Sequence, residues 1–433
     1  MKKNVSIFWF RRDLRLYDNK GFFEALKSKF KVLPIFIFDP EILNKLSSKD
    51  ARVYFIYKQL EELNKSLDDK QKIQTFYGLP VNIFKLIIKK YNVKSVYTNC
   101  DYEPYANKRD KSINNLLNQE NISFYSFKDQ VIFEKNEIVK DDGTPYKVYT
   151  PYSKKWLKNF NEKALKEYTS ENYLNNIVSV KPQWVRLDQM GFSNPEVEIS
   201  SFKLNKNLIS NYNLHRNTPS IDGTSRLGPH LRFGTVSVRE IVKIASENAD
   251  ITFLKELIWR EFFMQILWHF PHTVTKSFKP KYDLIEWRNN KEEFKKWCEG
   301  KTGYPLVDAG MRELNKTGFM HNRVRMLVGS FLCKHLLIDW RWGEAYFATK
   351  LHDFELSSNI SNWQWVAGCG VDAAPYFRIF NPTTQISKFD NKHKYIKKWV
   401  PEYQEFSYPN QIVEHKFARK RCIEVYKSAL NSA

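Results

Sequence analysis

The sequence predicts an N-terminal α/β domain with a Rossmann-like parallel sheet, then a long linker and a larger all-helical domain. Strand and helix patterns alternate over the first third, periodicity is lost from about residue 130 to 205, and helical periods dominate thereafter. We therefore place the domains at 1–130, 131–204 and 205–433. A chain of 433 residues has room for two or three domains of about 150 residues each.

The α/β prediction rests on the order of short apolar runs in the first third. Strand-like runs rich in branched and aromatic residues lie at 5–10, 32–38, 73–76 and 95–98. Helical periodicity separates them at 20–29, 53–67 and 81–90. Such alternation indicates βαβ units, whose ligands bind beyond the carboxyl ends of the strands. Here that edge is expected near residues 10–15, Asp39 and 100–105.

The middle and C-terminal parts give weaker local signals. Residues 141–145 form a turn pattern, and 181–195 have no sustained period, which indicates an ordered connection. Beyond residue 205 the strand signals fade, and the last helix is expected near 414–429. No internal repeat or low-complexity tail is present.

Composition limits the class of protein. The formal net charge of +21 favours a polyanionic partner, most simply nucleic acid, although lysines spread over all solvated faces would give the same excess. The five cysteines are widely spaced without a CxxC motif, which indicates neither a disulfide framework nor a zinc site. Because we see no signal-peptide pattern and no apolar run of 18 residues, we expect a reduced, cytosolic, soluble protein.

The most informative segment is 363–382, which is rich in large rings and small residues. Trp363 and Trp365, two positions apart, cannot share one helix face, so they must meet different environments. The glycines that follow, such as Gly368, allow a large group to approach the backbone. A plain hydrophobic core rarely needs this mixture.

Two segments carry residue types that suit a phosphate or a base. Residues 223–234 open a helix with Pro229 in its first turn, and the Thr and Ser hydroxyls with Arg226 suit a diphosphate, although many ordinary helix caps look the same. On the helix around 256–263, a carboxylate, an indole and a guanidinium share one face. That face could bind a base and a phosphate, or form only a surface ion pair.

Two further segments complete the pattern. In 318–326, Asn322 and Met326 share a face next to Arg323. Residues 351–355 add two carboxylates, and Asn359 precedes Trp363 by four residues. Each fragment alone could be a cap or an ion pair, but their combination over 160 residues makes coincidence implausible.

With these segments in this order, the chain resembles the class I cyclobutane-pyrimidine-dimer photolyases of the photolyase/cryptochrome family. The resemblance covers nearly the whole length, from 8–15 to 412–416. The most specific stretches are 259–262, 300–309, 320–325 and 363–382. The predicted domain order is also that of the family.

The resemblance implies a reduced FAD in the helical domain. The residues that match the family's FAD site are Tyr212, Thr224, Ser225, Arg226, Leu227, Gly228, Trp259, Arg325, Asp353, Glu355 and Asn359. Among them, Arg325 and Asp353 match an ion pair over the flavin ring, and Asn359 matches the residue that faces flavin N5. Gly228 replaces a usual Ser, Glu355 replaces a usual Asp, and the residues around Asn359 are atypical.

The resemblance also implies an electron path and a lesion pocket. Trp363, Trp340 and Trp287 match the tryptophan chain that photoreduces the flavin, and Glu256 matches the residue that stabilises the dimer radical anion. The residues that match lesion or DNA contacts are Arg216, Glu256, Trp259, Arg260, Asn322, Arg323, Met326, Trp365, Arg378 and Lys388. Photolyases extrude the pyrimidine dimer from the duplex, as a general example of base flipping.

A second chromophore is expected in the N-terminal domain. The segment 103–105 resembles relatives that bind a flavin-type antenna, 8-hydroxy-deazaflavin or FMN, while Tyr105 and Ala106 replace the polar pair expected for methenyltetrahydrofolate. Asp39 and 100–101 border the expected crevice. A folate-bound or empty crevice is the alternative.

The resemblance thus implies light-driven repair of cyclobutane pyrimidine dimers in UV-damaged DNA, by a cytoplasmic, nucleoid-associated monomer without membrane or obligate protein partners. A cryptochrome-type photoreceptor, which lacks repair, is the first alternative. A (6-4) photolyase calls for a histidine pair, whereas here Asn322 and Arg323 follow His321. After the (6-4) photolyase, the third alternative is a flavin-dependent DNA-binding module without catalytic turnover.

Overall fold

The structure is a computed structural model that describes residues 2–162 and 165–431. The chain forms two compact units. Unit 1 comprises Met1–Glu137, Asn159–Ser201 and Leu227–Ala249, and unit 2 comprises Ile138–Lys158, Phe202–Arg226 and Asp250–Ala433. All five strands of the described residues belong to unit 1, whereas unit 2 is helical.

Unit 1 contains a parallel sheet with the strand order β3-β2-β1-β4-β5. The strands are β1 Asn4–Phe10, β2 Val32–Phe38, β3 Gln74–Tyr77, β4 Asn92–Asn99 and β5 Ser123–Phe127. The parallel sheet and its first four strands confirm the prediction. The edge strand β5 was not predicted, because none of its residues is buried and its sequence has no apolar run.

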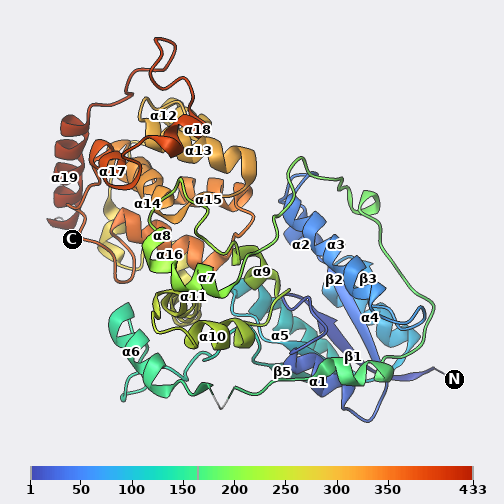
Figure 1. Ribbon diagram of the computed structural model, residues 1–433. Coiled ribbons are helices and arrows are strands. Elements are labelled where there is room, and N and C mark those ends of the chain that lie inside the picture. Colours follow the sequence, from blue (N-terminus) through green and yellow to red (C-terminus); the bar gives the residue numbers. More distant parts are fainter. Residues whose placement is uncertain (1, 163–164, 432–433) are drawn as a thin grey trace. The chain divides into compact units, whose positions relative to one another are not determined.

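Alternation along β1 gives the sheet two apolar faces. Phe8 and Phe10 pack with the helices Lys20–Leu26 and Ala51–Lys65, whereas Ile7 and Trp9 pack with Pro80–Lys90 and Pro104–Gln119. The helices of unit 1 are α1 Lys20–Leu26, α2 Pro40–Leu43, α3 Ala51–Lys65, α4 Pro80–Lys90, α5 Pro104–Gln119, α9 Gly228–Phe233 and α10 Val238–Ser246 (Figure 1). Two 3₁₀ turns, Ser170–Asn176 and Asp188–Met190, complete the described helical segments of unit 1.

The two units of the structure do not follow the predicted domain boundaries at 130 and 204, because each unit combines three separate segments of the chain. Helices α9 and α10 lie in unit 1, where Leu14 N–H donates to the Phe233 carbonyl at 3.0 Å. The Arg239 guanidinium of α10 pairs with the buried carboxylates of Asp18 and Asp129, each at 2.9 Å. Long-range ion pairs of this kind leave no periodic signal, so spacing alone could not place these helices.

The predicted linker at 131–204 is not a separate element. It contains α6 Tyr149–Asn159, most of which belongs to unit 2, and most of its remaining residues belong to unit 1. The helical pattern of α6 was missed because turn and proline signals surround it.

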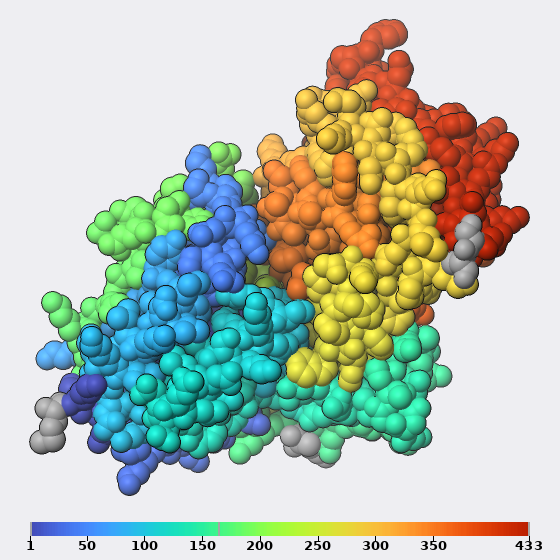
Figure 2. Space-filling model, turned by 180° about the vertical axis from the view of Figure 1, so that it is seen from behind, coloured from blue at the N-terminus to red at the C-terminus, as the bar shows by residue number. Residues whose placement is uncertain are grey.

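Unit 2 is a helical assembly around α16. Its helices are α6, α7 Lys206–Ser210, α8 Tyr212–His215, α11 Thr252–His269, α12 Lys291–Glu299, α13 Pro305–Thr317, α14 Asn322–Ser330, α15 Trp340–Lys350, α16 Leu356–Ala367, α17 Pro382–Phe389, α18 Lys394–Trp399 and α19 His415–Asn431. Short 3₁₀ turns lie at Pro271–Val274 and Pro280–Leu284, and a π-helical turn, Phe331–His335, follows α14. Helix α19 lies on the surface of unit 2, where Figure 2 shows the C-terminal residues in red.

Helix α16 packs against α11, α14 and α15, and this packing positions the candidate site. Gly343 of α15 allows the closest approach, because a Cβ there would come within 2.1 Å of the Trp363 ring. Any larger residue at 343 would push α15 away from α16.

The described residues also bear on the composition-based expectations. All five cysteines are free thiols, and no group of three or more potential metal ligands occurs among the described residues. Within that same part of the chain, no helix has the length and apolar character needed to cross a bilayer.

Candidate functional site

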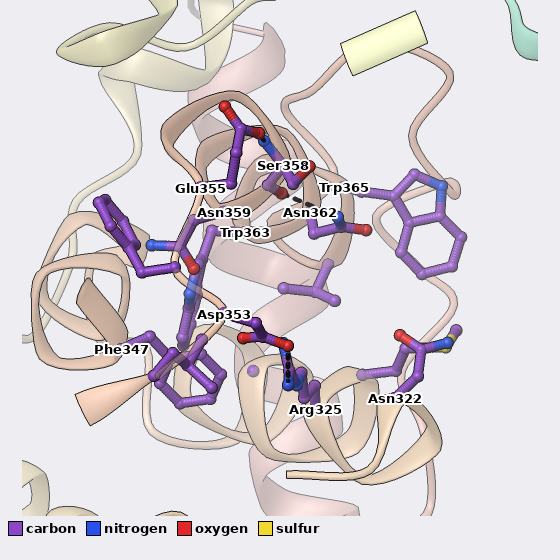
Figure 3. A pocket seen from close by; sticks show the side chains of 15 residues that line it. Asn322, Arg325, Phe347, Asp353, Glu355, Ser358, Asn359, Asn362, Trp363 and Trp365 are labelled. Carbon is purple, nitrogen blue, oxygen red and sulfur yellow. Dashed lines mark hydrogen bonds and ion pairs between the residues drawn. The ribbon is translucent and has the colours of Figure 1, made fainter. Parts of the chain in front are cut away.

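A cavity that opens to solvent lies in unit 2 between α14, α15, α16 and the segment 351–355. It is lined by Asn322, Arg325, Met326, Gly329, Phe347, Leu351, Asp353, Phe354, Glu355, Ser358, Asn359, Asn362, Trp363, Trp365 and Val366 (Figure 3). The i, i+3, i+4 and i+7 spacing on α14 and α16 directs one face of each helix into it. Polar groups and large rings thereby share one space.

A bidentate ion pair forms the centre of the polar wall. Arg325 Nη1 and Nη2 donate to Asp353 Oδ1 and Oδ2 at 3.2 and 2.8 Å (Figure 3). Arg325 Nε also donates to the Met320 carbonyl at 2.7 Å, which fixes the plane of the guanidinium. Because planar bidentate pairs are geometrically specific, this wall presents a rigid charge pattern to the cavity.

Asn359 is held in place from α15. Its Nδ2 donates to Glu344 Oε1 at 2.8 Å and to the Glu344 carbonyl at 3.2 Å. Burial raises the pKa of Glu344, an effect that the hydrogen bond from Asn359 opposes. The amide orientation at 359 is therefore set by a carboxyl group that the sequence did not single out.

Glu355 and His321 act as helix caps at the edge of the site. The Glu355 carboxylate accepts from the N–H groups of Ser357 and Ser358 at the start of α16, so its extra methylene is accommodated by capping. His321 Nδ1 accepts from Arg323 N–H at the start of α14. Burial and nearby guanidinium groups lower the pKa of His321 to about 4, so the ring remains a neutral acceptor at neutral pH.

The three tryptophans of the expected electron path belong to one aromatic region. Trp363 and Trp340 are buried in the same hydrophobic core, and the half-buried Trp287 packs against it. Trp363 lines the cavity and contacts α15 at Gly343, one turn after Trp340. Trp365 also lines the cavity but is only partly buried, so the two tryptophans of 363–365 differ in exposure while sharing one site.

Of the residues expected around the lesion, Asn322, Met326 and Trp365 line the cavity, whereas Glu256, Trp259 and Arg323 are not among its lining residues. Arg216 Nη1 lies 2.6 Å from Glu256 Oε1, so the expected lesion-binding carboxylate is held by a guanidinium.

The guanidinium of Arg323 lies near the Arg216–Glu256 ion pair, between two other side chains of unit 2. Its Nε donates to Asn217 Oδ1 at 2.7 Å, and its Nη1 lies 3.6 Å from Met326 Sδ, which connects it to the cavity wall. Burial and the charge of Arg216 lower the pKa of Arg323, while Glu256 raises it. Asn217 had no signal in the sequence.

The remaining side chains expected to contact DNA differ in solvent exposure. Arg260 is half-buried on α11, whereas Arg378 and Lys388 are exposed.

Trp259 is half-buried, and its ring stacks on Tyr149 with centroids 3.6 Å apart and an interplanar angle of 5°. Tyr149 was not predicted, because nothing in local spacing relates α6 to α11.

The expected phosphate-binding segment is divided between the units. Thr224, Ser225 and Arg226 belong to unit 2, whereas Leu227 and Gly228 belong to unit 1, with Gly228 as the first residue of α9. Pro229 lies in the first turn, as predicted.

Arg226 has an unusual backbone and an aromatic partner. Its φ is +57°, a left-handed conformation that residues other than glycine rarely adopt. Its guanidinium lies 3.5 Å from the Phe319 ring centroid, and Arg325 lies 5.7 Å from the same ring. Phe319 thus connects the 223–226 segment to the ion pair of the cavity wall, a role that the sequence did not indicate. Tyr212 packs edge-on against Phe253.

In unit 1, the expected antenna residues meet at the carboxyl edge of the sheet. The Tyr105 hydroxyl donates to the Asp39 carboxylate, which also caps α2. Arg109 lies 4.8 Å from the Trp9 ring and 5.8 Å from the Tyr105 ring. Asp101 pairs with Arg12 at 3.1 Å. Tyr105 and Asp39 thus lie together, and Arg109 is an added neighbour.

With this geometry established, comparisons with known proteins identify the family. Residues 6–170 match the DNA photolyase family, and residues 253–407 match the FAD binding domain of DNA photolyase. The deoxyribodipyrimidine photo-lyase of Vibrio cholerae is 34% identical, over 98% of this chain and 100% of that protein.

Two solved structures share the fold over almost their full length. A bacterial class III photolyase from Agrobacterium tumefaciens has a TM-score of 0.88 and 31% identity, covering 100% of this chain and 98% of that one. An archaeal photolyase from Sulfolobus tokodaii with two FAD molecules has a TM-score of 0.81 and 33% identity, covering 98% and 100%.

A five-stranded parallel sheet, a helical unit and an FAD-binding domain define the photolyase/cryptochrome class of protein. Within that class, the chain belongs to the DNA photolyase family.

Proposed function

We propose that this protein repairs cyclobutane pyrimidine dimers in DNA by light-driven electron transfer from reduced FAD. The two carbon–carbon bonds that join the pyrimidines would break, and the electron would return to the flavin, so that no net redox change occurs. The observation that carries the proposal is the composition of one cavity. Its walls contain the Arg325–Asp353 pair and Trp363, which match the family's flavin site, together with Asn322 and Trp365, which match its lesion site. An electron donor and an acceptor that share one cavity are close enough for direct transfer.

The residues present fit FAD. The walls of the cavity combine aromatic and apolar side chains with fixed polar groups, as the sites of ring-shaped cofactors do. Arg325, Asp353 and Asn359 would hold the polar edge of the ring, and Arg226 would bind a phosphate. When bound and reduced, FAD would supply the light-excited electron donor.

The protein's own groups would then position the substrate and exclude water. Trp365 and Trp259 offer stacking surfaces, and Asn322 offers an amide for base edges. Glu256 would hydrogen-bond the dimer once the lesion displaces Arg216, its present partner at 2.6 Å. Exposed Arg378 and Lys388, with the net charge of +21, would contact the DNA backbone.

The deciding experiment measures dimer loss under blue light. Chemically reduced protein is mixed with an oligonucleotide that carries one thymine cyclobutane dimer, with a dark control and a (6-4) photoproduct control. Light-dependent loss of the cyclobutane dimer alone supports the proposal. No loss despite bound, reduced FAD would favour the cryptochrome-type alternative, and loss of the (6-4) product would favour the other repair branch.

The class and the antenna are finer proposals. We propose membership of class I from the motif pattern, while the similar Agrobacterium tumefaciens protein is described as class III. We also propose a flavin-type antenna, 8-hydroxy-deazaflavin or FMN, at the Asp39–Tyr105 edge of unit 1. The Sulfolobus tokodaii photolyase, with its two FAD molecules and a proposed light-harvesting cofactor, supports a flavin there. Mass spectrometry of the chromophores released from purified protein distinguishes these from methenyltetrahydrofolate.

We further propose that the protein acts as a monomer on chromosomal DNA in the cytoplasm, without an obligate partner. Size-exclusion chromatography with light scattering, with and without a damaged oligonucleotide, tests the oligomeric state.

A further inference from the structure

The Trp259 indole has one face covered by another ring of unit 2. Tyr149, the first residue of α6, stacks on it at 3.6 Å and 5°. Phe262 packs edge-on against both rings, at 5.6 Å and 79° from Trp259 and at 5.9 Å and 75° from Tyr149. The Phe263 ring lies 5.2 Å from Trp259 at an angle of 36°. Trp259 is nonetheless only half-buried, so part of its surface stays accessible.

Tyr149 is itself fixed at two points. Its hydroxyl donates to the Lys255 carbonyl at 2.9 Å, one turn before Trp259 on the same helix α11. Its backbone N–H donates to Asp372 Oδ2 at 3.1 Å, and Asp372 holds a left-handed φ of +49° within the segment 363–382. Burial, together with the charge of Glu256, raises the pKa of Tyr149, so the hydroxyl remains a donor at neutral pH.

These contacts decide between two roles for the stacked ring. A ring that occupies the stacking face until a base arrives should be exposed and weakly held. Tyr149 is only 9% exposed and is bonded to the helix that carries Trp259. Moving it out would break both bonds and open a cavity under α11.

We propose that Tyr149 is a positioning residue for substrate: it holds the plane of Trp259, so that a flipped pyrimidine stacks on the part of the indole that stays accessible. This rests on the function proposed above, in which Trp259 stacks on the lesion. An indole without this backing could rotate about two side-chain torsions, and binding would have to restore its order. Asp372 contributes by fixing the backbone of Tyr149.

The test compares Tyr149→Leu, which keeps apolar volume but removes the stack, with the matched Tyr149→Phe, which keeps the ring. Affinity for an oligonucleotide with one cyclobutane dimer is measured in the dark by fluorescence anisotropy, and repair per absorbed photon is measured at saturating substrate. We expect Tyr149→Leu to raise Kd roughly fivefold and Tyr149→Phe to stay within about twofold. FAD content and the repair yield of bound substrate should not change in either variant.

A double-mutant cycle with Trp259→Ala separates positioning from general loosening. If Tyr149 acts through Trp259, Tyr149→Leu should not raise Kd further in the Trp259→Ala background. An additive loss, or an unchanged Kd in a folded Tyr149→Leu protein, overturns the proposal. If Tyr149→Leu does not fold, Asp372→Gly replaces it in the cycle, because glycine removes the acceptor and tolerates the left-handed φ at 372; the same direction and the same additivity criterion apply. Absence of repair by the unaltered protein rejects the proposed function itself, whereas normal repair with an unaffected Tyr149→Leu variant rejects only the role of Tyr149.

Discussion

At the scale of single residues, the candidate site depends on side chains whose partners come from distant segments. Arg325 and Asp353 are 28 residues apart, and Glu256 pairs with Arg216, 40 residues away. The resemblance indicated these site residues, but not Glu344 or Asn217, which hold Asn359 and Arg323. Contacts between helices leave no periodic trace in a sequence, so such supporting residues could not be predicted from it.

Replacing Glu256 by Ala should lower repair. The variant loses the carboxylate expected to stabilise the dimer radical anion and leaves Arg216 without its partner. We expect roughly a two- to tenfold lower repair yield per absorbed photon, with flavin content near normal. Glu256→Gln, which keeps a hydrogen-bonding group, should retain more activity than Ala. An unchanged yield in Glu256→Ala would remove Glu256 from the catalytic set.

Replacing Trp340 by Phe tests the electron path separately from repair. Trp340 is buried, and its Nε1 has no hydrogen-bond partner among the described residues. Phenylalanine therefore removes the indole that would carry the electron without breaking a hydrogen bond. The variant should lose photoreduction of oxidised FAD yet repair normally when the flavin is reduced chemically. Transient absorption after a laser flash measures the first, and the dimer assay measures the second. Normal photoreduction would place the path elsewhere.

At the scale of elements, periodicity predicted the buried strands best, and it missed elements that are exposed or surrounded by turn signals. The strands β1 and β2 are almost wholly buried and were predicted nearly to their ends. The exposed edge strand β5 and the helix α6 were missed. The packing of α10 in unit 1 was also missed. The helix buries an apolar stripe of Val238, Ile241, Val242 and Ala245, but such a stripe does not indicate which unit it packs against, and the ion pairs of Arg239 leave no periodic signal.

The ion pairs that hold α10 allow a stability prediction. Asp129 is 1% exposed and binds Arg15 at 2.6 Å and Arg239 at 2.9 Å. Asp129→Asn would leave both guanidinium groups without this charge, so we expect the free energy of unfolding to fall by about 3–5 kcal/mol. Chemical denaturation measures it. The exposed Glu240→Gln, on the same helix, should change stability by less than about 0.5 kcal/mol.

The same carboxylate predicts the direction of the pH dependence. Burial acts to raise the pKa of Asp129, but Arg15 and Arg239 dominate, so the folded-state pKa lies below the model-peptide value of 3.8. The stabilisation is therefore fully present above about pH 4 and is lost as the pH falls through the folded-state pKa. Denaturation between pH 3 and 6 should show this loss for the unaltered protein and a smaller one for Asp129→Asn. Equal slopes would show that Asp129 does not contribute.

At the scale of the whole molecule, the net charge of +21 was compatible with nucleic acid binding or with evenly solvated lysines. The structure singles out Arg323, beside the cavity wall, as a candidate contact for nucleic acid. Its guanidinium donates a hydrogen bond to Asn217 and lies 5.1 Å from the centroid of the Phe389 ring. A guanidinium fixed on both sides is prepared to bind one phosphate. Charge alone could not distinguish this residue from the many solvated lysines.

Arg323→Ala should therefore weaken binding to damaged DNA and flatten its salt dependence. Each phosphate contact contributes close to one unit to the slope of log K against log salt, so the slope should fall by about 1. The matched control is Lys89→Ala, which removes the same charge from the exposed end of α4 in unit 1 and should leave the slope unchanged. Anisotropy titrations between about 50 and 200 mM salt measure both variants. If the two variants lower the slope equally, the interaction with DNA follows total charge; if only Arg323→Ala lowers it, the phosphate is bound beside the cavity.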